Sequence, residues 1–459
     1  MATNHPIMRL ASVAALALLP AVAATGQDQL AITGGRVVPV VGDPIENGIV
    51  LIRGGTIQAV GTDLEIPIEA KVIDASGKVV LPGFVEPHSP EPLVQPNEVN
   101  PNVPFVTVVD AIDPNATYFE DARRNGVTTV HAIPGNNTMF GGKSAVVKTS
   151  GTFAEDMILK RDAALKLSLR PSGSSSRMSH LSRLRRELDE TKRYMKTLEE
   201  KRKEDQDAQA QADDDREEPD DESAPRQEED EDEEPDRDSD SSTPDPAEPD
   251  PQREAMVRLL KGELTAFIYC ELAMDVPQAL RLIDDYGLDA VLILGRDCHK
   301  AVGLLAGREI PVILDPSLVF WETDPRTDKD ELVVLPRIYR EAGVPITFQT
   351  AGGSSVSAAT IGPNYLWFQA ATAVKYGMPI EEAIEALTLR PARLLKIDEF
   401  VGSIEEGKDA DLIILTGDPL RLGTWVDTTI IDGRVVYRRD EDSRLKELLR
   451  PSISERGEP

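Results

Sequence analysis

The stretch VLPGFVEPHSP, from Val80 to Pro90, decides how the rest of the chain is interpreted. An apolar run that ends at Leu81 is interrupted by Pro82 and Gly83, and a second short run then ends on polar residues. Side chains at positions i and i+2 of a strand point to the same face, so two imidazoles at these positions can bind one metal ion. Here His88 holds the first position but Pro90, which has no side-chain donor atom, holds the second.

Short β patterns flank this stretch at both ends of the chain. Before it, two apolar runs at 48–53 and 56–60 are joined by Gly54 and Gly55, which predicts a hairpin. Near the other end, VGSIEEGKDADLIIL (401–415) is followed by TIIDGRVVY (429–437), which reads as further strands. A two-stranded piece is marginal alone, so we expect strands from the two ends to pair.

These stretches resemble the amidohydrolase superfamily of metal-dependent hydrolases. Residues 82–90 are similar to its first-strand signature Pro-Gly-x-Ile-Asp-x-His-x-His, and residues 402–412 to its C-terminal signature Gly-x-Ile-x-x-Gly-Lys-x-Ala-Asp-Leu. GGKSAVVK (141–148) resembles imidazolonepropionase-like members. The resemblance implies an α/β fold, a TIM-like (β/α)8 barrel with a composite β-sandwich domain built from both chain ends.

Alternating strand and helix patterns between the two ends agree with a barrel, apart from one insert. In the insert, 178–203 is charged with apolar residues at helical spacing, whereas 204–250 holds 24 acidic and three basic residues, a net charge of −21 out of −30. A tract this polar cannot bury enough apolar surface to offset the conformational entropy that it would lose on ordering. We expect this division: signal peptide 1–26; composite β domain 27–80 and 401–440; barrel 81–175 and 253–400, including a helix at 331–342; charged helical insert 176–203; disordered acidic tract 204–252; C-terminal tail 441–459.

The resemblance also implies where metal ligands and the catalytic acid should stand. In the family these are two His on strand one, a Lys or Glu midway, a His on each of strands five and six, and a strand-eight Asp that acts as general base toward a metal-bound water. At the corresponding positions we place Glu86, His88, Pro90, Tyr269, Leu294 and Ala351. Three histidines and the aspartate are therefore missing, so a hydrolase of the family's metal type is expected to be disabled, with His88 as the remnant and no cofactor.

A replacement site is a less favoured alternative. Cys270, Glu271, Cys298 and His299 follow one another near the ends of consecutive predicted strands, where a Cys–His pair or a soft-metal site could form. Strand alternation, however, sends Tyr269 and Cys270 to opposite faces, so the Cys270 thiol should point away from the barrel interior.

The remaining features bear on location and partners. Leu10 to Ala24 is an apolar run of signal-peptide length, and the small residues Ala21-Val22-Ala23 at its end form a cleavage site. Whether translation begins at Met1 or at Met8, this predicts export to the periplasm or the medium. After signal removal no run is long enough to span a membrane. No basic cluster with interleaved aromatics suggests a nucleic-acid surface.

Three functions remain open at this stage. The first is an exported homologue without the metal site that acts as a binding or assembly subunit, beside an active paralogue or as a homo-oligomer. The second is an active hydrolase of C–N bonds, in dipeptides or other compounds, with a rearranged site and Zn²⁺ or another divalent metal. The third is a scaffold whose acidic tract recruits basic partners or cations.

Overall fold

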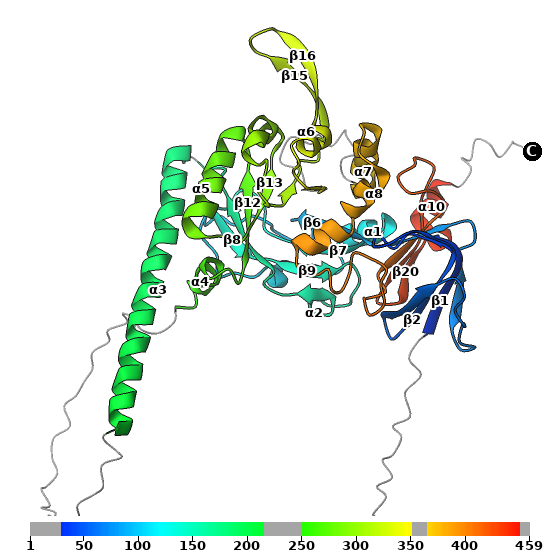
Figure 1. The fold of residues 1–459 in the computed structure, drawn as a ribbon, viewed down its shortest axis with the longest axis horizontal. Coiled ribbons are helices and arrows are strands. Elements are labelled where there is room, and N and C mark those ends of the chain that lie inside the picture. The colour runs from blue at the N-terminus through cyan, green and yellow to red at the C-terminus, as the bar shows by residue number, and fades with distance from the viewer. Residues whose placement is uncertain (1–28, 172, 174, 215–249, 351–364, 450–459) are drawn as a thin grey trace, which may run out of the picture.

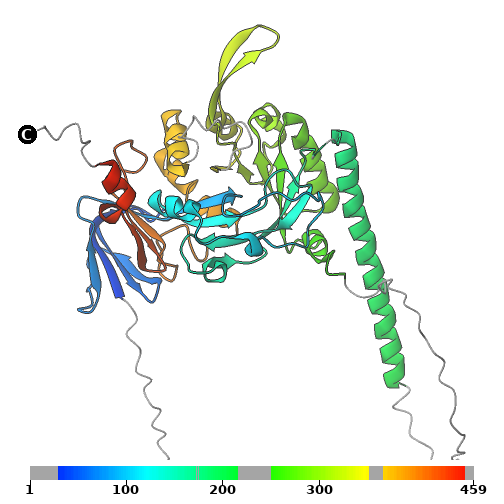
Figure 2. The same cartoon turned by 180° about the vertical axis from the view of Figure 1, so that it is seen from behind.

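A computed structural model describes residues 29–171, 173, 175–214, 250–350 and 365–449 (Figure 1). The predicted signal peptide, Ala351, most of the acidic tract and the last ten residues of the expected tail lie outside the described residues. The described part is an α/β fold with mixed sheets, seen from opposite sides in Figures 1 and 2.

Strands from both chain ends share one eight-stranded sheet. Its order is β20-β19-β18-β5-β1-β2-β3, with β4 paired to β1. Ile32, Val50, Val80, Leu412 and Ile430 fill its core. The strands are β1 (Gln29–Val37), β2 (Ile45–Arg53), β3 (Thr56–Gly61), β4 (Lys71–Asp74), β5 (Val79–Pro82), β18 (Leu412–Leu415), β19 (Val426–Ile431) and β20 (Arg434–Arg438).

Two further sheets form the central body. A four-stranded sheet has the order β10-β9-β7-β6 and a six-stranded sheet the order β17-β14-β13-β12-β11-β8, with parallel pairing from β11 through β17 and between β6 and β7. Their strands are β6 (Phe84–Ser89), β7 (Val127–Ala132), β9 (Ala145–Lys148), β10 (Ile158–Lys160), β8 (Phe140–Lys143), β11 (Ala164–Ser168), β12 (Thr265–Cys270), β13 (Ala290–Leu294), β14 (Val312–Ile313) and β17 (Ile346–Thr347).

Helices cover the outer side of these sheets (Figure 1). The α-helices are α1 (Thr117–Arg124), α2 (Ala154–Met157), α3 (Arg177–Asp214), α4 (Glu254–Leu260), α5 (Val276–Tyr286), α6 (Leu335–Glu341), α7 (Leu366–Lys375), α8 (Ile380–Glu385), α9 (Leu389–Leu394) and α10 (Ser443–Leu448). The 3-10 helices are η1 (Val108–Ala111), η2 (Ala273–Asp275), η3 (Arg296–Leu304) and η5 (Arg439–Glu441). Among the described helices, none is both long and apolar enough to cross a bilayer.

The chain passes from the eight-stranded sheet into the central body at Gly83. The Gly83 N–H donates to the Asp411 carbonyl at 2.9 Å, and a Cβ added to Gly83 would lie 2.1 Å from Thr128 Oγ1. Only glycine allows this approach without displacing β7.

A buried ion cluster also joins the two parts. Lys148 Nζ in β9 lies 2.6 Å from Asp409 Oδ2 and 3.3 Å from Asp411 Oδ1, and it also contacts Asp432. Burial raises the pKa of Asp411 to about 6 although the lysine lowers it. Asp409 and Asp411 belong to the C-terminal signature, so that motif has a structural role here.

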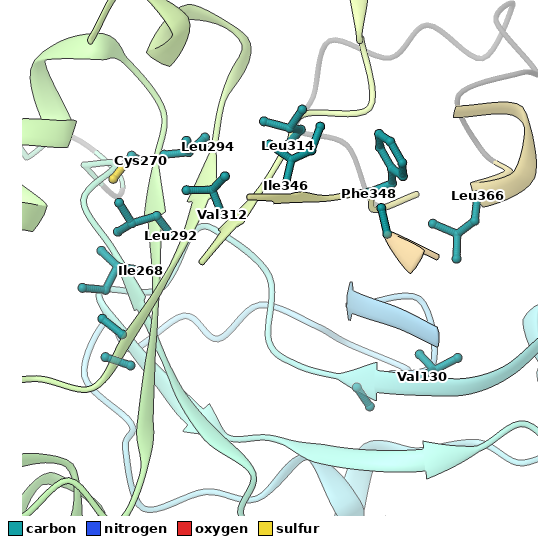
Figure 3. Close-up of a cluster of buried hydrophobic side chains, with 14 of the residues drawn as sticks. Val130, Ile268, Cys270, Leu292, Leu294, Val312, Leu314, Ile346, Phe348 and Leu366 are labelled. Carbon is teal, nitrogen blue, oxygen red and sulfur yellow. The ribbon is translucent and has the colours of Figure 1, made fainter. Parts of the chain in front are cut away.

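Strand alternation divides the apolar core of the central body into two layers. Ile268, Cys270, Leu292 and Leu294 belong to the layer against the helices (Figure 3). Phe267, Tyr269, Val291 and Ile293 belong to a second cluster on the opposite side of the same strands.

The structure corrects three expected boundaries. Helix α3 extends to Asp214, beyond the expected end at Lys203, because the residues that follow are helix formers and the first proline is Pro219. In the tail, Ser443–Leu448 forms α10, whose N-cap is Asp442. The helix expected at 331–342 begins only at Leu335, because Lys329–Val334 forms β16, which pairs with β15 (Val319–Asp324) in a projecting hairpin.

Candidate functional site

Strands β6, β7 and β11 carry a group of buried polar side chains. Glu86 and His88 lie on β6, His131 on β7 and Lys166 on β11, and all four are buried. Because their surroundings are largely apolar, each of these buried groups needs a polar partner within the protein.

Lys166 and His88 form the central contact. Lys166 Nζ lies 2.7 Å from His88 Nε2, and 5.8 Å from the centre of the Tyr269 ring. Burial lowers the pKa of the Lys166 ammonium well below its usual range. The pKa of His88 is also well below its usual range, first because the ring is buried and second because Lys166 is close. With Nε2 as the acceptor, Nδ1 carries the hydrogen, and this buried atom has no hydrogen-bond partner.

His131 has both ring nitrogens occupied. Nδ1 lies 2.9 Å from the Pro87 carbonyl and Nε2 lies 2.6 Å from Ser144 Oγ. Burial lowers the pKa of His131 to about 3, so the ring stays neutral. His131 therefore ties β6 to the loop before β9 and has no free lone pair for a ligand.

Glu86 faces the segment that follows β17. The Thr350 hydroxyl donates to Glu86 Oε2 at 2.8 Å, and the Thr350 N–H donates to the same carboxyl at 3.2 Å. Burial raises the pKa of Glu86 to about 8 despite these bonds, so the neutral acid predominates at pH 7. A neutral carboxylic acid is a weak metal ligand.

The other sequence-assigned positions do not add donors to this group. Pro90 is partly buried beyond the end of β6, and Tyr269 lies beside Lys166. The assignment of Leu294 is corrected: it packs in the helix-facing layer, and the residue on the side of Tyr269 is Ile293, because neighbours on a strand alternate. Ala351 lies outside the described residues.

The alternative thiol site does not assemble. Cys270 and Cys298 are buried in the helix-facing layer, and burial raises the pKa of both thiols. Glu271 pairs with Arg170, at 3.2 Å, and His299 Nε2 lies 3.3 Å from Glu322. The thiols are thus protonated, and the His299 imidazole contacts a carboxylate.

Among the described residues, the side chains of this group contact other protein groups and do not converge as a set of metal ligands. His88 Nε2 contacts the lysine amine, both nitrogens of His131 are bonded, and Glu86 is largely protonated. Within the described ranges, no three His, Cys, Asp or Glu side chains converge. The stretch 351–364, which follows Thr350 directly, contains none of these four residue types in its sequence.

Lys166 is the site residue that sequence reasoning left unassigned. The resemblance implied a Lys or Glu midway along the chain, and a single lysine in the apolar strand ALKLS (164–168) was the available signal. Its contact with His88, 78 residues earlier, follows only from the sheet packing.

Comparisons with known proteins find similarity to amidohydrolases and imidazolonepropionases. The Amidohydrolase family model matches residues 329–436. An imidazolonepropionase from Brevibacillus brevis is 43% identical over 71 residues, which is 13% of this chain and 17% of that protein. One from Thermoplasma volcanium is 32% identical over 123 residues, 25% of this chain and 29% of that protein. The chain thus matches less than a third of the length of these relatives.

Solved structures extend the similarity to the whole fold. The crystal structure of an amidohydrolase from Thermotoga maritima superposes on this chain with a TM-score of 0.72 at 27% sequence identity. The aligned region covers 89% of this chain and 100% of that chain.

Proposed function

We propose that this chain, which belongs to the amidohydrolase superfamily, has a (β/α)8 barrel that has lost the metal-dependent hydrolase site, and that it acts as a binding or assembly subunit. The barrel is supported by the parallel order of β11 through β17 and by the contact of Thr350, just after β17, with Glu86 in β6. That contact links the segment just after the edge strand β17 of one sheet to the edge strand β6 of the other.

One observation carries the loss of the metal site: Lys166 Nζ lies 2.7 Å from the Nε2 atom of His88. The imidazole that stands at a ligand position is thus paired with an amine, whereas a metal ligand needs that lone pair for the ion. No carboxylate is in hydrogen-bond contact with this amine among the bonds of the described residues. The pair supports a polar core contact in place of a catalytic centre.

Metal analysis of the purified chain tests this proposal. After dialysis, we expect substoichiometric zinc, manganese and iron, and no hydrolysis of imidazolone-type or dipeptide C–N bonds above the buffer rate. His88→Ala should leave both readouts unchanged, as should His299→Ala, a matched control outside the site. Stoichiometric metal that survives dialysis and is lost in His88→Ala but not in His299→Ala would contradict the proposal.

The second candidate, an active C–N hydrolase with a rearranged site, is favoured by the similarity to the Thermotoga maritima amidohydrolase along most of the chain. It requires Zn²⁺ or another divalent ion on donors other than those described above, and the same metal analysis separates it from the first. A physical partner for the first candidate is an active paralogue or a second copy of the chain.

Export to the periplasm or the medium is part of the proposal. It is supported by the apolar run from Leu10 to Ala24 and the small residues at 21–23. Fractionation of cells that express the chain with a C-terminal tag tests it: we expect a processed form, shortened by about the first 26 residues, outside the cytoplasm.

A further inference from the structure

The β15–β16 hairpin is fixed to the body at its base, where Val333 and Val334 are buried, and farther out by one face. Its two strands pair with each other and with no other described strand. On the fixed face, the Arg296 guanidinium lies 4.7 Å from the centre of the Phe320 ring, and Lys300 Nζ lies 2.6 Å from Glu322 Oε1. Both partners belong to η3, so the hairpin has a defined direction as it projects from the body (Figure 1).

The opposite face presents an apolar pair to solvent. Trp321 and Leu332 stand opposite each other in register, and their exposed fractions are 69% and 36%. A two-stranded hairpin is marginal in water, and its outer edges offer unpaired backbone groups. An exposed tryptophan on such a projecting arm is typical of a contact surface, since tryptophan is enriched at the centres of interfaces.

A groove of about 580 Å³ lies elsewhere on the molecule, between α7, the loop before β19 and α10. Its apolar rim is solvent-exposed: Leu422, Trp425 and Leu448 have exposed fractions of 81%, 51% and 82%. The Arg439 guanidinium lies 4.5 Å from the centre of the Trp425 ring, and the described residues give it no ion pair. The groove therefore offers an apolar floor with an unneutralised cation.

We propose that the hairpin of a second copy of this chain docks in this groove. The charge of the hairpin suits the groove arginine that has no ion pair among the described residues. The hairpin segment 322–331 holds five acidic and two basic residues. Of the arginines that line the groove, Arg124, Arg421 and Arg444 pair with carboxylates of their own chain, which leaves Arg439 for an acidic partner. In both views the hairpin and α10 lie apart with α7 and α8 between them (Figures 1 and 2), so the contact joins two molecules.

Docking buries exposed apolar side chains of the hairpin and of the groove in the same contact. Trp321 and Leu332 leave water against an apolar floor, and the acidic end of the hairpin approaches Arg439. This self-association would be one form of the assembly role proposed above, and its biological meaning rests on that proposal. The contact itself does not, because neither surface includes the metal-ligand positions. Metal content and oligomeric state are separate readouts, so either proposal can fail alone.

Sedimentation velocity of the whole chain over a range of concentrations tests the proposal. We expect the wild type to self-associate above the monomer mass of 50.1 kDa. Trp321→Glu, Leu332→Lys and Arg439→Glu should each weaken association by about 30-fold for a central contact. The matched control is Ile68→Glu, which alters a fully exposed apolar residue between β3 and β4 and should leave association unchanged.

A mixing experiment distinguishes this contact from general damage. The Trp321→Glu chain keeps its groove and the Arg439→Glu chain keeps its hairpin, so a mixture of the two should associate more strongly than either alone. A monomeric wild type at every concentration, a Trp321→Glu chain that associates like the Ile68→Glu control, or a mixture without recovery would each overturn the proposal. It is also overturned if the wild type associates only after residues 450–459 are removed, since the chain's own end is then the occupant.

Discussion

Replacing Lys148 with Met removes the cation that holds the eight-stranded sheet against the central body. Its ammonium lies 2.6 Å from Asp409 Oδ2 and 3.3 Å from Asp411 Oδ1, and the lysine and Asp411 side chains are both buried. The second oxygen of Asp411 has no hydrogen-bond partner, and Oδ1 accepts one other bond, from the Asp432 N–H at 2.9 Å, so the lysine is the one cation in contact with this carboxylate among the described residues. Breaking a buried pair by removal of one partner costs about 3–5 kcal/mol.

We expect the loss in the free energy of unfolding to lie in the lower part of that range. Asp409 and Asp432 are partly exposed and can be hydrated, and the pKa of Asp411, already raised to about 6 by burial, rises further without the lysine. Protonation of Asp411 then limits the loss to about 3 kcal/mol in the free energy of unfolding. Urea denaturation followed by tryptophan fluorescence measures this loss as a lower midpoint.

Two further variants make the result specific. Lys78→Met removes a similar ion pair, 2.8 Å from Asp427, whose members are both partly exposed, so it should cost less than about 1 kcal/mol. Adding Asp411→Asn to Lys148→Met should recover more than half of the loss, because the uncompensated charge is gone. A Lys148→Met chain as stable as Lys78→Met would refute the reasoning.

Three other outcomes follow from the same contacts. Glu86 has a pKa raised from about 4.5 to about 8, so its contribution to the stability of the folded state is present at low pH and is lost as pH rises from about 4.5 through about 8. Glu86→Gln should therefore equal the wild type in stability at pH 5 and exceed it at pH 8. The difference should be up to about 1.4 kcal/mol for each pH unit between these two pKa values, measured by urea titration at both pH values. Lys166→Met places an apolar side chain of similar length where the buried amine has a hydrogen-bond contact with His88 alone among the described residues, so thermal unfolding at pH 7 should occur at the same or a higher temperature. A marked fall would instead indicate a required ligand for this amine. Gly83→Ala drives a methyl group to 2.1 Å from Thr128 Oγ1 and should cost at least about 2 kcal/mol, whereas Gly303→Ala, where no atom lies within 4 Å, should cost less than about 1 kcal/mol by the same assay.

Much of the fold could be predicted from the chain itself. Gly83 and the C-terminal motif around Asp411 are local signals, and the structure joins them through one hydrogen bond between their backbones. Period-two alternation also placed Cys270 on the helix side, since this depends only on its neighbours along the strand.

Other features depend on distant residues and could not be predicted in this way. The end of α3 was misplaced because composition alone does not separate a charged helix from a disordered tract. The hairpin was missed because Lys329–Val334 carries mixed charges that suit a helix equally well, and its strand form depends on pairing with Val319–Asp324.

By itself the sequence determined the superfamily and the joining of the two chain ends, whereas the assignment of Pro90 and Tyr269 to ligand positions of the family stays a prediction. Only the tertiary structure decided that Lys166 meets His88, that Leu294 faces the helices, and that Trp321 stands exposed on a projecting arm. The physical reason is that local propensity and strand period act over a few residues, whereas the partner of a buried side chain is selected by sheet register and packing across the whole chain.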